Sequence, residues 1–232
     1  MRTPERLAPA DAFSDLVLAV VLTLLAGLIA AVLAQPLMAR FDLPLLAVLM
    51  LQGVLILAGL QFLLSRRRQG WPDIGLTLPV PLDLLRALIA LGLVYLVNMA
   101  FMGLILLLFP DVLEDHQDRL FGVASSLTAE LSLLAIALAM LFTGFYEEVL
   151  ARGFLLSRCR RLVGGVWGPV LISSFLFGLG HAYQGWAGVL QTALIGVVFA
   201  RLALRWGRLW PLIIAHGALN TISLALMRMA GG

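Results

Sequence analysis

Residues 131–153 read LSLLAIALAMLFTGFYEEVLARG, and this stretch decides the fold. From Leu131 to Phe145 no side chain is ionisable, and the run then meets two adjacent acids, Glu147 and Glu148. About 20 consecutive apolar residues are typical of a helix that spans a membrane. An acidic pair inside such a helix is costly to insert, so its first interpretation is a functional one.

The composition of the whole chain agrees with this interpretation. Of 232 residues, 62% are hydrophobic and 12% are charged, whereas a typical soluble domain is about half apolar and a quarter charged. We therefore predict an integral protein of the cell membrane, with little chain left over for a soluble domain.

Apolar runs on both sides of this stretch predict an all-α fold, a polytopic transmembrane helical bundle of about seven spans. The expected spans are 16–34, 43–64, 83–109, 126–158, 167–182, 187–204 and 209–227. An eighth, half-length segment around 71–83 is an alternative, and 110–125 is expected to be a polar, acidic loop. One integral membrane domain results, with N-terminal helices and loops in 1–125 and the polar motifs in 126–232.

The positive charges indicate the orientation of the chain. All sixteen basic residues are arginine, and they gather at the N-terminus and in the connections 65–71, 158–161 and 201–208. Because short cytoplasmic loops are enriched in arginine, the N-terminus is predicted to be cytoplasmic. The arginines that set this orientation also account for the net charge of +3. The charge therefore does not indicate binding to nucleic acid, and we expect no nucleic-acid partner. The single cysteine, Cys159, allows no internal disulfide and is interpreted as incidental.

The acidic pair has a spacing that separates its two members. On a helix Glu148 and Arg152 are four residues apart, so their side chains meet on one face. Glu147 points about 100° away, because successive residues of an α-helix are offset by that angle. One acid is thus neutralised within its own helix while the other faces something else. The alternative is that both acids mark the membrane exit, balanced by nearby arginines.

Two later segments place polar side chains one helical turn apart. Phe177 and His181 are four residues apart, with Gly178 and Gly180 between them, and such small residues let another helix approach closely. Packing by a hydrogen-bonded histidine is the structural alternative for this motif.

His216 and Asn220 repeat the same spacing, so an imidazole and an amide project together from the last span. Both side chains can donate hydrogen bonds, and a purely packing role is again the alternative. Strongly polar residues on three spans would be a heavy burden without a common cavity. Together they supply a carboxylate base, a histidine to share a water, and two neutral donors, which are the parts of water-mediated acyl hydrolysis.

These motifs resemble the CAAX protease and bacteriocin-processing (CPBP, or Abi) family, which includes the type II CAAX prenyl endopeptidases. The family pattern is EExxxR, FxxxH and HxxxN on successive membrane helices. The chain matches it with Glu147, Glu148, Arg152, Phe177, His181, His216 and Asn220. Ala151 departs from the aromatic residue that commonly precedes the motif arginine.

The resemblance implies an intramembrane endopeptidase of the CAAX-protease type that hydrolyses a membrane-presented, in some relatives lipidated, peptide or protein. By analogy Glu147 is the general base, His181 shares the water, and His216 and Asn220 form the oxyanion hole. Glu148, Arg152 and Phe177 would support the site. Which of the two glutamates is the base stays open.

Three alternatives remain from the residues themselves. The same polar cavity could serve a proton or ion transporter, since intramembrane Glu and His are also used in proton relays. It could also belong to a non-catalytic immunity or scaffold protein. Finally, Glu147, His181 and His216 could ligate zinc, although no HExxH spacing occurs. We expect metal-free chemistry without a cofactor.

Overall fold

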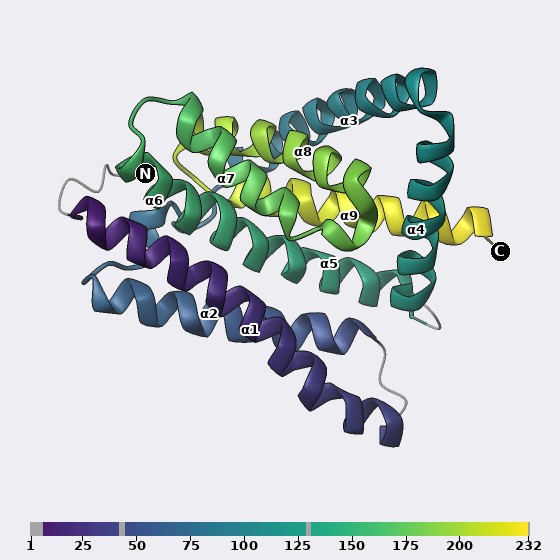
Figure 1. Ribbon diagram of the computed structural model, residues 1–232, viewed down its shortest axis with the longest axis horizontal. Coiled ribbons are helices and arrows are strands. Elements are labelled where there is room, and N and C mark those ends of the chain that lie inside the picture. Colours follow the sequence, from purple (N-terminus) through teal and green to yellow (C-terminus); the bar gives the residue numbers. More distant parts are fainter. Residues whose placement is uncertain (1–6, 42–44, 129–130, 232) are drawn as a thin grey trace.

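The computed structural model describes residues 7–41, 45–128 and 131–231, and every regular element in these ranges is a helix (Figure 1). The prediction of an all-α helical bundle is confirmed. The elements are α1 (Pro9–Phe41), α2 (Leu45–Arg66), η1 (Trp71–Ile74), α3 (Leu82–Leu108), α4 (Pro110–Thr128), α5 (Leu133–Glu148), η2 (Val149–Leu155), α6 (Leu156–Leu162), α7 (Trp167–Leu179), η3 (Ala182–Gln184), α8 (Gly185–Trp206) and α9 (Trp210–Gly231).

Six stretches of the described chain are long and apolar enough to cross a membrane, and the chain is a multi-pass membrane protein. These stretches are Pro9–Pro36, Leu45–Arg66, Leu82–Leu108, Leu133–Leu162, Ala182–Trp206 and Trp210–Ala230. The fifth predicted span, 167–182, is the short helix α7 of 13 residues. At 1.5 Å per residue this helix covers about 20 Å, less than the thickness of a bilayer core.

Several predicted boundaries shift in the structure. α1 continues through Pro36 to Phe41 rather than ending near residue 34, and the predicted start of the second span at Leu43 lies outside the described residues. The region around 71–83 holds only the short 3-10 turn η1 before α3. It therefore forms no half-length membrane helix, consistent with its three prolines.

The acidic connection 110–125, predicted to be a loop, is the helix α4. Figure 1 shows α4 running across the end of the bundle, between the end of α3 and the start of α5. Its inward side chains recur at helical spacing and are buried or half-buried: Leu113, His116, Leu120, Ala124 and Leu127. Pro110 at its first position and the Asp115–Arg119 pair four residues apart also favour a helix.

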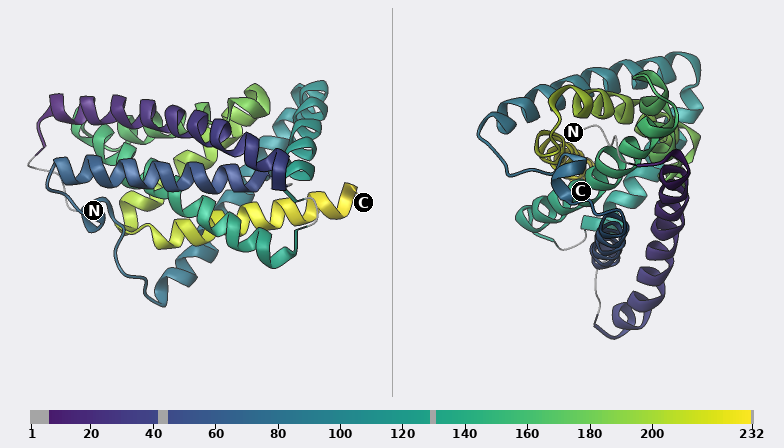
Figure 2. Two further views of the ribbon diagram at one scale, coloured as in Figure 1. Left: turned by 90° about the horizontal axis from the view of Figure 1, so that it is seen from below. Right: turned by 90° about the vertical axis from the view of Figure 1, so that its left-hand side faces the viewer.

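The N-terminal pair of helices is held to the rest by a buried carboxylate. α1 and α2 lie side by side, as both views of Figure 2 show. Asp15 of α1 is 1% exposed and accepts hydrogen bonds from Arg67 at 3.0 Å and from Arg158 of α6 at 3.2 Å. The hydrogen bond with Asp15 raises the pKa of Arg67. Arg67 and Arg158, which the sequence placed in arginine-rich connections, thus tie the ends of α2 and α6 to Asp15 of α1.

The remaining helices enclose the polar motifs. α5 packs against α9, α7 packs against α8, and α3 packs against both α8 and α9. α5 begins at Leu133, capped by the Ser132 hydroxyl, rather than near Ser126. The predicted division after residue 125 falls inside α4. One apolar cluster joins α1, α2, α5, η2 and α9, and a second joins α3, α7, α8 and α9. The three polar motifs lie on the helices that these clusters hold together.

Candidate active site

The acidic pair lies where α5 ends and a π-helical segment begins. Glu148 is the last residue of α5, and Val149–Leu155 continue as η2, in which hydrogen bonds reach five residues back. Such π-helical turns are rare in proteins, and many of those that do occur lie at functional sites. The Glu148 side chain is fully buried, while that of Glu147 is 17% exposed. The two adjacent acids therefore have different surroundings, as their spacing predicted.

Glu148 is the centre of a buried polar cluster. One of its oxygens, Oε1, accepts hydrogen bonds from Arg152 Nη1 and from His216 Nδ1, both at 2.8 Å. The Arg152 guanidinium is itself buried and lies 4.1 Å from the centre of the Phe177 ring. A buried charge is tolerated only when it is paired in this way. Glu148 therefore links two of the three motifs, and Phe177 covers the arginine.

A close crossing of α5 and α9 makes these contacts geometrically feasible. A Cβ on Gly144 would lie 3.0 Å from the backbone nitrogen of Gly217, and one on Gly217 would lie 2.8 Å from the Leu141 Cα. Real Cβ atoms essentially never come within 3.0 Å of backbone, so the helices can meet this closely only because residue 217 is glycine, and a Cβ on Gly144 would push the neighbouring backbone away. Glu147 and Glu148 follow one turn after Gly144, and His216 precedes Gly217.

His181 lies beyond the end of its helix. α7 ends at Leu179 rather than at 182, but the rings of Phe177 and His181 still contact, with centroids 4.9 Å apart. The Phe177 carbonyl is 3.1 Å from His181 Nδ1. Because a carbonyl only accepts, Nδ1 carries the proton and Nε2 keeps its lone pair. Of the two nearby glycines, Gly178 meets α8, as predicted, whereas Gly180 meets only the Phe177 carbonyl.

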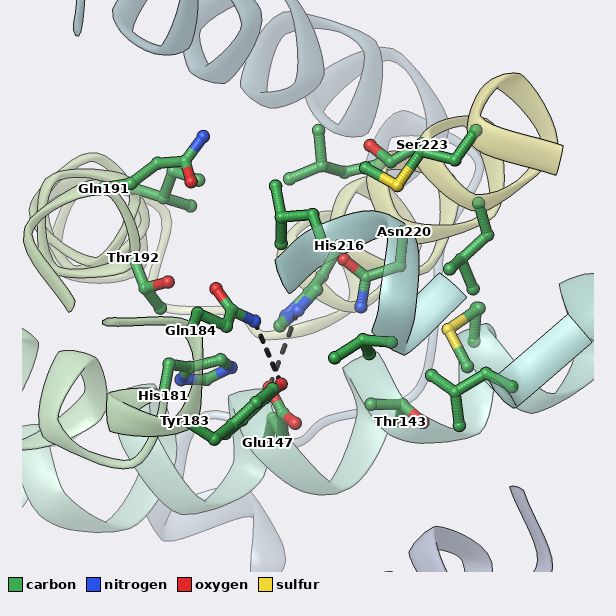
Figure 3. A pocket seen from close by; sticks show the side chains of 18 of the residues that line it. Thr143, Glu147, His181, Tyr183, Gln184, Gln191, Thr192, His216, Asn220 and Ser223 are labelled. Carbon is green, nitrogen blue, oxygen red and sulfur yellow. Dashed lines mark hydrogen bonds and ion pairs between the residues drawn. The ribbon is translucent and has the colours of Figure 1, made fainter. Parts of the chain in front are cut away.

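A cavity of about 460 Å³ joins the four side chains that the motifs predicted to be catalytic (Figure 3). Its polar lining includes Thr143, Glu147, His181, Tyr183, Gln184, Gln191, Thr192, His216, Asn220 and Ser223. Its apolar wall includes Phe121 of α4 and Met227 of α9, together with side chains of α2, α3, α5, α7 and α8. The cavity is thus part polar and part apolar, as a site for an amphiphilic molecule would be.

Within this cavity one oxygen of Glu147 has no hydrogen-bond partner in the described part of the chain. Oε2 is buried without a hydrogen bond among the described residues and lies 3.6 Å from His216 Nε2. Buried polar atoms in proteins are nearly always satisfied. This carboxylate oxygen can therefore accept a hydrogen bond from a water or a polar ligand in the cavity. Figure 3 shows His181 and Asn220 on either side of Glu147.

The donors are not arranged as a metal site. In the described part of the chain, no group of three or more His, Cys, Asp or Glu side chains could hold a metal ion. The alternative zinc set of Glu147, His181 and His216 therefore lacks a ligand geometry here. Metal independence itself stays a prediction.

Several cavity residues are absent from the three motifs. Thr143 precedes Glu147 by one turn, and its buried hydroxyl has no partner among the described residues; the spacing of four residues could have identified it. Tyr183 and Gln184 come from the connection between α7 and α8, where the Gln184 amide donates to the Tyr183 hydroxyl at 2.9 Å. No spacing in the sequence indicates that this turn folds over the acids.

Comparison with known proteins supports the resemblance. The model of the family described as Type II CAAX prenyl endopeptidase Rce1-like matches residues 129–222. The matched segment contains every motif residue from Glu147 to Asn220, so the suspected family is confirmed over this part of the chain. Neither a curated protein nor a solved structure matches the chain.

Proposed function

We propose that this chain, with its Rce1-like segment, is an intramembrane endopeptidase that hydrolyses a peptide bond with a glutamate-activated water. The observation that carries the proposal is the unpartnered, buried oxygen of Glu147, which faces a cavity shared with His181, His216 and Asn220. The family match supports endopeptidase activity of the CAAX-protease type, and the glutamate mechanism is our inference.

The first step is activation of water. A water in the cavity donates one hydrogen bond to the Glu147 carboxylate and the other to the lone pair of His181 Nε2. Glu147 is the better base of the two acids, because Glu147 lines the cavity and Glu148 does not. Glu148 is also paired with the Arg152 guanidinium, which stabilises its carboxylate and makes it a weaker base. The water oxygen then attacks the substrate carbonyl carbon, and Glu147 takes up the proton as the new C–O bond forms.

The second step is collapse of the tetrahedral intermediate. The Asn220 amide, and His216 when Nε2 carries a proton, donate hydrogen bonds to the oxyanion. Glu148 fixes the orientation of His216 by accepting from Nδ1. The C–N bond breaks as Glu147 returns its proton to the leaving amine, so the products are a carboxylic acid and a free amine, and the Glu147 carboxylate is regenerated.

The mixed lining of the cavity supports a membrane-presented substrate. Its apolar wall, which includes Leu120, Phe121 and Leu127 of α4, suits an apolar chain, while the polar wall suits a peptide backbone. We therefore propose a lipidated or membrane-anchored peptide as the substrate class.

The proposal is tested with the purified protein in proteoliposomes and two quenched-fluorescent peptides. One ends in S-farnesyl cysteine followed by three residues, and the other is identical but lacks the lipid. We expect cleavage that survives rigorous chelation and that His181→Ala abolishes, with mass spectrometry locating the new carboxylate. Cleavage that chelation stops would contradict the metal-free mechanism, and Glu147-dependent ion flux without cleavage would favour a transporter.

A further inference from the structure

The third histidine of the chain, His116, lies outside the family motifs and is buried in the structure. It is 1% exposed, on the inner face of α4, and the chain has only three histidines. A buried imidazole needs hydrogen-bond partners, and those of His116 belong to other elements. They lead toward the candidate active site.

One ring nitrogen of His116 contacts a side chain of α8. Nε2 lies 2.9 Å from Gln191 Oε1, and the amide nitrogen of Gln191 donates to Asn98 of α3 at 2.6 Å. The second contact sets the orientation of the Gln191 amide, so its oxygen faces the imidazole and accepts from Nε2. α4, α8 and α3 are thus joined by one chain of hydrogen bonds.

The other ring nitrogen contacts the turn that carries His181. Nδ1 lies 3.4 Å from the carbonyl oxygen of Gln184, the last residue of η3. The backbone nitrogen of Gln184 in turn donates to the His181 carbonyl at 2.9 Å. Because the Gln184 carbonyl and the Gln191 oxygen both accept, the ring makes both hydrogen bonds when each of its nitrogens carries a proton. In that form, one residue of α4 is two hydrogen bonds away from the backbone of His181.

The packing around this contact leaves little freedom. A Cβ on Gly188 would lie 2.4 Å from the Gln184 Cβ and 3.4 Å from the His116 Cε1, so a glycine is needed for the turn to sit against α8 and α4. Tyr183, in the same turn, places its ring 5.9 Å from that of His181. The turn is thus confined by α4 on one side and α8 on the other.

We propose that His116 is a positioning residue: by bridging Gln184 and Gln191 it holds the turn 182–185 so that His181 faces Glu147. This inference rests on the proposed function, in which His181 Nε2 binds the hydrolytic water. A shift of about 1 Å in such a group can cost on the order of 100-fold in rate. His116 would therefore act on turnover, not on substrate affinity.

The experiment uses full-length protein labelled with ¹⁵N in its histidine rings, in detergent micelles. Three histidines give three sets of ring signals, each assigned by substitution. We expect His116→Phe, which keeps ring size but removes both donors, to shift or broaden the His181 signals and to leave those of His216 in place. With the farnesylated peptide as the probe, kcat should fall about 10- to 100-fold while KM changes little.

Two matched variants separate positioning from general packing. His116→Gln retains an amide that can donate, and we expect it to restore the His181 signals and most of the turnover. Glu114→Gln, an exposed change on the same helix, should leave both unchanged.

Wild-type His181 signals in the His116→Phe protein would overturn the inference, and so would a loss of turnover without any change at His181. If the His116→Phe protein does not fold, the exchange of the His116 Nε2 proton with water is measured in the wild-type protein instead. Slow exchange is expected for a proton bonded to Gln191, and fast exchange would overturn the inference. The ring signals do not depend on cleavage, so failure of this inference is distinguishable from failure of the proposed function.

Discussion

At the scale of single residues, the adjacency of Glu147 and Glu148 separates two tasks. Glu148 accepts hydrogen bonds from Arg152 and His216 through one oxygen, whereas its neighbour Glu147 lines the cavity and presents an oxygen without a hydrogen bond to it. This separation follows from the 100° offset of neighbours on a helix, which is why the sequence could predict it. The contact between Glu148 and His216 could not be predicted, because it depends on how closely α5 and α9 cross.

Removing the structural acid should destabilise the fold. In Glu148→Ala the Arg152 guanidinium loses its carboxylate while it stays buried, and breaking a buried pair in this way costs about 3–5 kcal/mol. Denaturant unfolding in micelles measures the loss. The exposed Glu114→Ala should change the free energy of unfolding by less than about 0.5 kcal/mol. Equal stability of the two variants would contradict the structural role of Glu148.

Loss of one oxyanion donor should lower turnover without unfolding the protein. Asn220→Ala removes an amide that lines the cavity, and removing a single such donor costs about 10²–10³ in kcat. Peptide cleavage in proteoliposomes measures it. Thr221→Ala on the same helix is the control, since that hydroxyl bonds only to the carbonyl of Gly217 at 2.7 Å. Unchanged kcat in Asn220→Ala would remove the amide from the mechanism.

At the scale of elements, the site depends on how helices meet and end. The spacing of four residues predicted that Glu148 meets Arg152 and that His216 and Asn220 project together, and the structure agrees in both cases. Phe177 and His181 also contact, but through a turn after the end of α7 and not along one helix face. The α4 helix was missed because many charged residues in a segment are typical of a loop. Its buried and half-buried side chains nevertheless follow a helical period: Leu113, His116, Leu120, Ala124 and Leu127. The turn over the site was missed because its hydrogen-bond partner, His116, lies 68 residues away from Gln184.

A methyl group at the α5–α9 crossing should separate the two helices. Gly144→Ala forces a contact with the backbone of Gly217, and overpacking of this kind costs about 1–3 kcal/mol. Turnover should fall as well, since the crossing holds Glu148 against His216. Gly103→Ala in α3 is the matched control, because nothing lies within 4 Å of its added Cβ. The free energy of unfolding and kcat are measured for both, and similar values would show that the close approach is not required.

At the scale of the whole molecule, charge separates the two ends of the bundle. Arginines gather at the end where α2 and α6 finish, while the acidic α4 crosses the opposite end (Figure 1). Composition alone predicted a membrane bundle, because so apolar a chain has no other stable environment. The number of full spans was not predictable from hydropathy, since α7 is as apolar as the spanning helices but has only 13 residues.

The predicted orientation places the arginine-rich end in the cytoplasm. Single cysteines at position 68, after α2, and at position 114, on α4, should react differently with a membrane-impermeant thiol reagent applied to intact cells. We expect Glu114→Cys to be labelled and Arg68→Cys to be protected until the cells are opened. Cys159 is buried, and Cys159→Ser provides a clean background. The reverse pattern would invert the topology.

The most direct test of the central claim concerns the carboxylate of Glu147. Glu147→Gln keeps the size of the side chain but removes the base, and loss of a general base costs about 10²–10⁴ in rate. Single-turnover cleavage of a membrane-presented peptide should fall by that factor, while Glu114→Gln turns over normally and both variants unfold like the wild type. A folded Glu147→Gln protein that cleaves the peptide at the wild-type rate would contradict the account.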